Sequence, residues 1–319
     1  MTLRVVFALL TVLCALPAVA ASPALPAFEV LERLNPTDPL PERETRWNHP
    51  GVTLAAVTYS TLPGYRPLRL DLYRAEGAVQ PRPLVVFVHG GGWSMGNPRT
   101  GAAFRDFTQV LAALAARGYV VASIEYRLNR EASHPASSQD LAAALGFLRS
   151  NASRFGVDAS RIALWGMSAG AHLGALQALT CEPAQCVQGF AGWFGVYDLR
   201  AYLDANAAAT NTRTAFGCAS GTCAPEQLAA ASPVTHVSGR APPVLLLHGL
   251  EDSNVSSRQS TEFAQRLQAA GKAAEVVLLP GVDHGFVGAD ANATRRALQQ
   301  ALTATFEFFD RVLRTAATP

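Results

Sequence analysis

Three residues far apart in the chain have the types and settings needed to transfer an acyl group. Ser168 is the centre of Gly166-Met167-Ser168-Ala169-Gly170, a G-x-S-x-G between an apolar run fit for a strand and an Ala- and Leu-rich run fit for a helix. Asp252 and His284 each follow a later apolar run fit for a strand. A serine nucleophile, a histidine base and a carboxylate that orients the base are the groups that this chemistry requires. The spacing predicts Ser168, Asp252 and His284 as catalytic residues.

The histidine is chosen by its loop, Gly281 to Phe286, which contains flanking glycines and comes last in the chain order. Histidine suits the role of base near neutrality because a free imidazole titrates at about pH 6.5. None of the other six histidines combines this loop with this order, so structural roles are expected for them. Two other acids remain open, because Glu251 is adjacent to Asp252 and Asp198 also follows a strand. Asp252 could instead be a helix cap or a solvated acid in a turn.

A glycine run follows an earlier strand, in the sequence His89-Gly90-Gly91-Gly92-Trp93. Glycine lets a backbone present consecutive amides at close range, and such donors stabilise the oxyanion formed during acyl transfer. The amides of Gly91, Gly92 and Ala169 are therefore predicted to form an oxyanion hole. A plain glycine-rich turn is the alternative, whereas a phosphate loop is excluded because no Gly-Lys-Ser/Thr follows.

Four aromatic residues follow strands near the expected active face: Trp93, Trp193, Phe194 and Tyr197. They could form an aromatic wall that binds substrate, and this is the role assigned to Trp93, Trp193 and Tyr197. Packing in the core or in loops is the alternative for each of them.

The pattern of apolar residues predicts the strands and helices that must position these residues. Strands are expected at Val52 to Ser60 and at Pro67 to Tyr73, where alternation predicts a half-buried antiparallel pair. Strand-like and helix-like segments then alternate, beginning with the wholly apolar run Leu84 to Val88. The pattern predicts an α/β fold: a mostly parallel central sheet with an antiparallel N-terminal hairpin and helices on both faces.

The further expected helices and strands are, in chain order, a helix at Phe104 to Arg117, a strand at Tyr119 to Ile124, a helix at Ser138 to Asn151, strands at Arg161 to Trp165, Phe190 to Val196 and Val244 to Leu247, a helix at Ser256 to Ala270, a strand at Ala274 to Leu279 and a helix at Ala293 to Leu313. Residues 200–240 are Ala-rich and lack a strand, which predicts an insertion that caps the top of the sheet.

The chain has 319 residues with a formal net charge of +2, and 49% of them are hydrophobic. This composition permits one large core, and the low charge argues against a nucleic-acid partner. Residues 1–20 read as a signal peptide: Arg4, an apolar run and the A-x-A site Ala18-Val19-Ala20. The run is too short to span a bilayer. We therefore expect a secreted or periplasmic protein whose single catalytic domain covers residues 21–319, with an irregular arm up to Pro50.

Four cysteines remain after this segment, in two pairs of C-x4-C spacing. An oxidising compartment favours disulfides, and short local loops favour Cys181–Cys186 and Cys218–Cys223 among the three possible pairings. A zinc site is the alternative, but no histidine lies close to either pair. No metal or cofactor is expected.

Several blocks together resemble a known family: HGGGW, G-x-SAGAHL, the run SPVTHVS–PPVLLLHG–ED, and the final DHGF. Between about Leu68 and Leu313 the chain is similar to the α/β-hydrolase superfamily, and to its HGGG-bearing carboxylesterases of the hormone-sensitive-lipase type. It is most similar to small secreted esterases that act on acetyl or feruloyl groups of plant polysaccharides. The G-x-S-x-G segment differs from that of one large subgroup of these esterases, because it reads GMSAGA where GDSAGG is common.

This resemblance implies the α/β-hydrolase fold, hydrolysis of a small-molecule or polysaccharide-linked ester without a cofactor, and the roles given above to the triad and to the amides. Two alternatives stay open. One is an amidase, arylformamidase or peptidase on the same scaffold, and the other is a binding protein that has lost catalysis. The sequence leaves the oligomeric state open.

Overall fold

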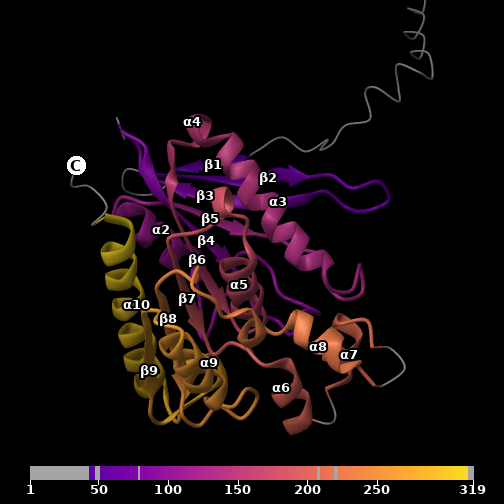
Figure 1. Cartoon of the computed structure of the whole chain (residues 1–319). Coiled ribbons are helices and arrows are strands. Elements are labelled where there is room, and N and C mark those ends of the chain that lie inside the picture. The colour runs from indigo at the N-terminus through magenta and orange to yellow at the C-terminus, as the bar shows by residue number, and fades with distance from the viewer. Residues whose placement is uncertain (1–42, 47–50, 78–79, 207–208, 219–221, 315–319) are drawn as a thin grey trace, which may run out of the picture. The chain divides into compact units, whose positions relative to one another are not determined.

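A mixed sheet of nine strands organises the computed structural model, which describes residues 43–46, 51–77, 80–206, 209–218 and 222–314 (Figure 1). The strands follow the order β1-β2-β3-β5-β4-β6-β7-β8-β9. Their bounds are β1 (Arg43–Arg46), β2 (Val52–Ser60), β3 (Leu68–Arg74), β4 (Arg82–Val88), β5 (Val120–Ile124), β6 (Val157–Met167), β7 (Gly189–Trp193), β8 (Val244–Gly249) and β9 (Ala274–Leu279). The signal peptide predicted at residues 1–20 and most of the predicted arm lie outside the described residues.

Strands β1, β2 and β3 pair antiparallel, and β3 also runs antiparallel to β5. From β5 through β4 and β6 to β9 every pairing is parallel. Because parallel strands share the direction of their ends, the loops after β4, β6, β8 and β9 emerge at one edge of the sheet. The predicted mixed α/β sheet with an N-terminal antiparallel part is confirmed.

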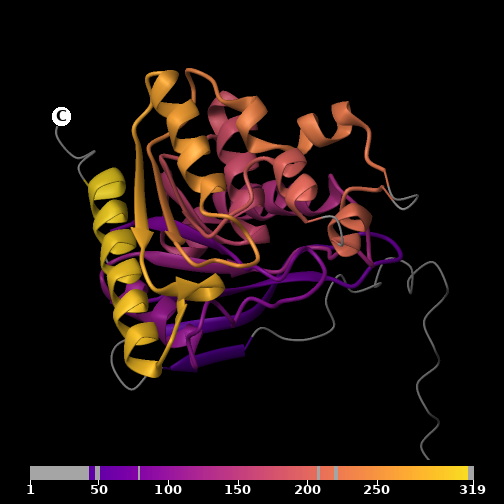
Figure 2. The same cartoon turned by 90° about the horizontal axis from the view of Figure 1, so that it is seen from below.

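Helices cover both faces of this sheet. The main ones are α2 (Phe107–Ala116), α3 (Ala136–Ser150), α5 (Ala169–Thr180), α9 (Arg258–Ala269) and α10 (Ala291–Arg314). Apolar side chains of α3, α5 and α9 join the core on one face, and those of α2 and α10 join the core on the other. Figure 2 shows α10, in yellow, on the side of the sheet opposite to α5 and α9.

Short elements complete the described chain. They are α4 (Ala152–Phe155), η1 (Pro183–Gln185), α6 (Leu199–Ala205), α7 (Thr210–Ala215), α8 (Pro225–Ala231), η2 (Pro233–His236), β10 (Val282–Asp283), η3 (His284–Phe286) and β11 (Val287–Gly288). The helices α7, α8 and η2 lie within residues 200–240, together with most of α6, and no strand occurs in the described part of that segment. Among the described residues, no helix combines the length and the apolar character needed to cross a bilayer.

Three local expectations were wrong. The segment expected to be an irregular arm contains β1, which pairs with β2. Strand β3 is not half-buried: Asp71 and Tyr73 are each 3% exposed, because Tyr73 packs with α2 on the second face. Asp71 is satisfied there by the side chain of Arg99 at 2.6 Å. Strand β7 ends at Trp193, earlier than expected, because Phe194 turns the chain with a φ of 39°.

Candidate active site

Ser168 occupies a sharp turn between β6 and α5. Its φ of 52° and ψ of −119° are a strained conformation for a residue with a side chain, and its amide donates to the carbonyl of Trp193 at 2.9 Å. The turn depends on two glycines, since a Cβ on Gly166 would lie 2.4 Å from the carbonyl oxygen of Gly170. A Cβ on Gly170 would lie 2.1 Å from that of Val88. The sequence therefore holds the Ser168 hydroxyl at the carboxyl edge of the sheet, as the predicted strand–turn–helix requires.

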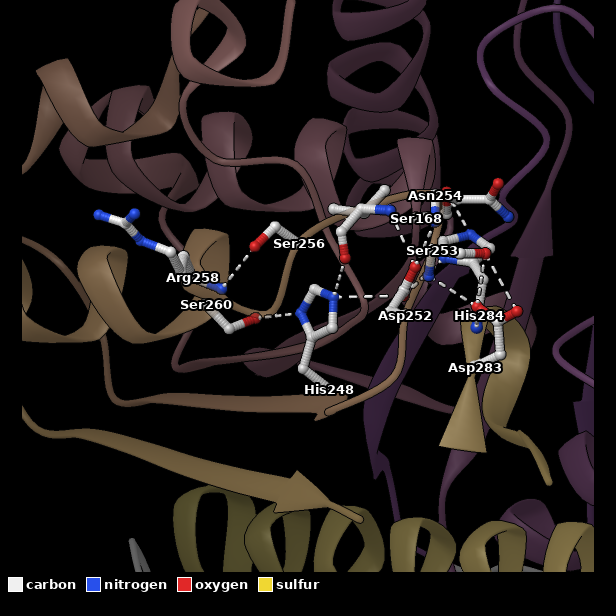
Figure 3. Close-up of polar contacts among 11 residues, drawn as sticks. Ser168, His248, Asp252, Ser253, Asn254, Ser256, Arg258, Ser260, Asp283 and His284 are labelled. Atoms are coloured by element: carbon white, nitrogen blue, oxygen red, sulfur yellow. Dashed lines mark hydrogen bonds and ion pairs between the residues drawn. The ribbon is translucent and has the colours of Figure 1, made fainter. Parts of the chain in front are cut away.

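The side chains of Ser168, His284 and Asp252 form a hydrogen-bonded row (Figure 3). The Oγ of Ser168 lies 3.2 Å from Nε2 of His284, and Nδ1 of His284 lies 2.8 Å from Oδ2 of Asp252. Because an ionised carboxylate only accepts hydrogen bonds, Nδ1 of His284 carries the proton and Nε2 is free to accept from the serine. This arrangement can remove the hydroxyl proton and form an alkoxide.

The side chain of Asp252 is 0% exposed, whereas that of His284 is 22% exposed. Burial by itself would raise the pKa of Asp252. Hydrogen bonds from His248 and His284 outweigh burial and hold this pKa well below its usual range. The carboxylate therefore stays charged and can stabilise an imidazolium at position 284.

Two more carboxylates join the loop that bears Asp252 to the loop that bears His284. Glu251 accepts hydrogen bonds from the amides of Gly281 and Val282, at 2.7 and 3.1 Å. In the opposite direction, Asp283 accepts the amide and the hydroxyl of Ser253. The carboxylate of Glu251 therefore binds the backbone of the loop that bears His284 and does not contact the ring of His284. Asp198, the third acid considered, caps α6 by accepting from the amide of Ala201.

The glycine run after β4 passes beside the serine. A Cβ on Gly90 would lie only 3.2 Å from the Cβ of Ser168. Gly91 has a φ of 119°, and a side chain there would meet the carbonyl of Met95 at 2.1 Å. In the described part of the chain, no hydrogen bond uses the amides of Gly91, Gly92 or Ala169. These three amides are therefore available to a ligand next to Ser168.

His89 and Tyr126 hold this glycine loop in place. The ring of His89 donates to the carbonyl of Gly90 at 2.7 Å and stacks on Tyr126 at 4.3 Å between centroids. The Tyr126 hydroxyl donates to the carbonyl of His89. Burial lowers the pKa of His89 to about 4, so this ring is neutral at physiological pH.

The three aromatic residues predicted to bind substrate are core residues. Trp193 is 0% exposed and its indole donates to Thr305, and Tyr197 is 0% exposed and stacks on Phe263. Trp93 is 4% exposed, and its indole donates to Nδ1 of the buried His172 at 3.3 Å. All three assignments were wrong: Trp193 packs from within β7 into the core on one face of the sheet, and Trp93 and Tyr197 pack into the core on the other.

A cavity of about 1030 Å³ opens in front of the row. Ser168, His284 and the glycine loop line it, and so does Phe194, whose ring lies 4.7 Å from that of His284. The segment 200–240 contributes Tyr202, Ala205, Asn206 and Ala209. Among the described lining residues there is no Asp, Glu, Lys or Arg. The cavity therefore suits an uncharged ligand.

Sequence reasoning missed several residues of this site. Phe194 was not predicted to bind substrate, although it lines the cavity and Trp93, Trp193 and Tyr197 do not. His248 was expected to be merely structural, yet its Nε2 lies 3.2 Å from Oδ2 of Asp252. Its position four residues before Asp252, at the end of the same strand, was the available signal.

Cys181 and Cys186 form one disulfide, and Cys218 and Cys223 form the other. This is the pairing that the spacing favoured over the alternatives. Each bridge closes a loop between residues only five apart in sequence, so each constrains a local turn. Within the described residues, no group of three or more His, Cys, Asp or Glu side chains could hold a metal.

A serine on a strained strand-to-helix turn, at the carboxyl edge of a mostly parallel sheet, with an acid and a histidine on later loops, defines the α/β-hydrolase class. The sequence model of the BD-FAE family matches residues 70–267, which is more than half of the chain. The chain belongs to this family of α/β-hydrolase esterases.

Relatives and solved structures agree with that placement. Esterase LipC of Mycobacterium tuberculosis is 31% identical over 76% of this chain and 65% of its own length. The chain spans about half to two thirds of the length of the first three curated relatives. A truncated carbohydrate esterase from gut microbiota superposes with a TM-score of 0.69, at 23% identity, over 85% of this chain and all of its own. Thermogutta terrifontis esterase 2, phosphoramylated by tabun, superposes with a TM-score of 0.65, at 25% identity, over 81% of this chain and 94% of its own.

Proposed function

We propose that this protein is a secreted serine carboxylesterase in which Ser168, His284 and Asp252 form the catalytic triad. The observation that carries the proposal is the continuous row from the hydroxyl of Ser168 to the buried carboxylate of Asp252, with both spacings at 3.2 Å or less. Family membership and the esterase names of the curated relatives support ester hydrolysis as the reaction.

The proposed reaction has two halves. In the first, His284 removes the proton of Ser168 as its oxygen attacks the ester carbonyl, and the amides of Gly91, Gly92 and Ala169 stabilise the negative oxygen. The tetrahedral intermediate collapses to an acyl-enzyme, and the alcohol leaves with the proton from His284. In the second half, His284 takes a proton from the water that attacks the acyl-enzyme and returns it to the oxygen of Ser168 as the acid is released. No cofactor takes part in either half.

The substrate proposed is a neutral ester with a short acyl group or an aryl group of the feruloyl type. The uncharged lining of the cavity supports neutrality, and Phe194, Tyr202 and the 65% exposed Met95 offer apolar contact to an aryl group. The fold shared with a carbohydrate esterase is consistent with a polysaccharide-linked ester. Export is supported by the two disulfides and by the leader predicted from the sequence.

A substrate panel tests the reaction class. The purified protein is assayed with p-nitrophenyl acetate, a long-chain p-nitrophenyl ester, methyl ferulate and a matched anilide, with Ser168→Ala as the control. We expect acetate or ferulate esters to be hydrolysed fastest, and Ser168→Ala to lose activity by about 10⁴-fold or more because the nucleophile is gone. Faster hydrolysis of the anilide than of the esters would show that the protein is an amidase and not an esterase. Equal turnover by Ser168→Ala would refute the nucleophile.

Covalent labelling gives a readout independent of substrate choice. An organophosphate such as paraoxon phosphorylates an activated serine, so mass spectrometry should find the diethylphosphoryl group on the peptide containing Ser168. A wild-type protein that is neither labelled nor active on any ester would favour the binding protein without catalysis.

A further inference from the structure

The buried carboxylate of Asp252 has more partners than the triad requires. Its Oδ1 accepts the amides of Asn254 and Val255, at 3.0 and 2.8 Å. Its Oδ2 accepts from Nδ1 of His284 at 2.8 Å and also lies 3.2 Å from Nε2 of His248. Figure 3 shows the two imidazoles on either side of the same carboxylate. One oxygen is thus shared by the histidine at the serine and by a second histidine.

The hydrogen bonds around His248 determine where its proton lies. Its Nε2 faces two acceptors, the carboxylate of Asp252 and the carbonyl of Val255 at 2.8 Å, so Nε2 must be a donor. Its Nδ1 lies 2.8 Å from the hydroxyl of Ser260, which can donate to it. A neutral imidazole with the proton on Nε2 therefore satisfies every contact without a buried cation. His248 and Ser260 are both 0% exposed, so water is not available as a substitute partner.

We propose that His248 is a positioning residue for catalysis: its Nε2, which donates to the carbonyl of Val255 and lies 3.2 Å from Oδ2 of Asp252, holds that oxygen where His284 needs it. The two amides hold Oδ1, and without His248 the second oxygen would be held by His284 alone. His284 must stay in line with Ser168 while it takes and returns a proton. The carboxylate of Asp252, which orients His284, therefore has to be held by a group other than His284. His248 holds this carboxylate from the carboxyl end of β8, where the strand pairs with β9. This inference rests on the proposed esterase function.

The competing explanation is that His248 only packs the loop, tying residue 255 to helix α9 through Val255 and Ser260. A packing role predicts lost stability with unchanged chemistry. A positioning role predicts lower kcat with little change in KM, and an altered pH profile. The groups that can titrate around His284 are Asp252, Asp283 and His248 itself, and Asp283 is engaged by Ser253 and by the amide of residue 284.

Two amide variants of similar polarity separate these explanations. In His248→Gln the side-chain NH2 can reach the position of Nε2, whereas in His248→Asn it is one methylene short. We expect His248→Asn to lower kcat by about 10- to 100-fold, with KM within about twofold, because a small misplacement of the catalytic groups is costly. We expect His248→Gln to recover most of that loss. Equal kcat values for the two variants would overturn the proposal.

The pH profile and a matched core variant complete the kinetic test. Without the donor from His248, Oδ2 presents more of its negative charge to His284, so the acid limb of kcat/KM should move to higher pH in His248→Asn. Thr305→Val removes another fully buried hydrogen bond, the one to Trp193, and should lower the thermal midpoint without moving that limb. A profile for His248→Asn that is superimposable on the profile of Thr305→Val would assign His248 to packing.

One measurement requires neither a variant nor activity. In wild-type protein labelled with ¹⁵N-histidine, the NMR spectrum should show the ring of His248 protonated on Nε2 and not on Nδ1. The reverse tautomer would overturn the proposal even if ester hydrolysis by the wild type, and its loss in Ser168→Ala, upheld the esterase function. Absence of ester hydrolysis with the expected tautomer would instead reject the function and leave the contact in place.

Discussion

At the scale of single residues, the site depends on which carboxylate reaches the histidine. Asp252 and Glu251 are neighbours in sequence, but their side chains have different partners. Asp252 turns into the protein and contacts His284, and Glu251 binds the amides of Gly281 and Val282. Both acids bind the loop of the histidine, one through its ring and the other through its backbone.

This difference predicts unequal effects of two isosteric substitutions. Asp252→Asn should lower kcat by about 10³- to 10⁴-fold, because an amide can donate to Nδ1 and favour the wrong tautomer of His284. Glu251→Gln retains a carbonyl oxygen for the two amides and should stay within about tenfold of the wild type. Steady-state hydrolysis of p-nitrophenyl acetate measures both. A larger loss of kcat in Glu251→Gln than in Asp252→Asn would assign the catalytic carboxylate to Glu251 in place of Asp252.

At the scale of elements, the turn between β6 and α5 is possible only because strand and helix approach very closely. Gly170 lies under the backbone of the chain leaving β4, where the carbonyl oxygens of Val88 and His89 leave no room for a Cβ. Neither carbonyl can move aside as a side chain could. The same contact brings the glycine loop and the nucleophile together, so packing and chemistry depend on one glycine.

A pair of Gly→Ala variants tests this packing. Gly170→Ala should lower the free energy of unfolding by about 1–3 kcal/mol or more, because backbone would have to shift. Gly146→Ala, in α3 with open space around its Cα, should raise that free energy by about 0.5–1 kcal/mol through helix propensity. Urea denaturation monitored by circular dichroism measures both. Equal stability of Gly170→Ala and wild type would show that the elbow is more adaptable than the structure implies.

At the scale of the whole molecule, two buried histidines connect stability to pH. Burial lowers the pKa of His89 to about 4 and that of His172 to about 3. In the unfolded chain each would titrate near 6.5, as a free imidazole does. Below that pH the unfolded state binds protons that the folded state does not bind, so stability must fall as the pH falls.

Between pH 6.5 and 5 this effect should reduce the free energy of unfolding by up to about 1.4 kcal/mol per pH unit for each of the two histidines. Most carboxylates remain ionised in this window and contribute little. In His172→Gln the free energy of unfolding should depend less steeply on pH than in the wild type, by as much as one proton. Urea denaturation at several pH values measures this slope. Parallel slopes for the two proteins would contradict the assigned burial effect.

The sequence alone specified the features that depend on local pattern and chain order. The apolar runs predicted all but one strand of the sheet, since a strand buried on both faces must be apolar throughout, as Leu84 to Val88 is. The glycines of G-x-S-x-G predicted Ser168 as the nucleophile, and the glycine-flanked loop predicted His284 as the base. The short spacing of the cysteines limited which bridges were geometrically easy.

Only the tertiary structure decided how distant side chains meet, because those contacts depend on register and packing between elements. It placed Asp252 rather than Glu251 against His284, and it put His248 behind that carboxylate. It also showed that Trp193 and Tyr197 are buried in the core. From the sequence, both a substrate-binding wall and core packing were possible for these residues. A sequence states which groups are present, but the direction of each side chain is set by neighbours that fold onto it from elsewhere in the chain.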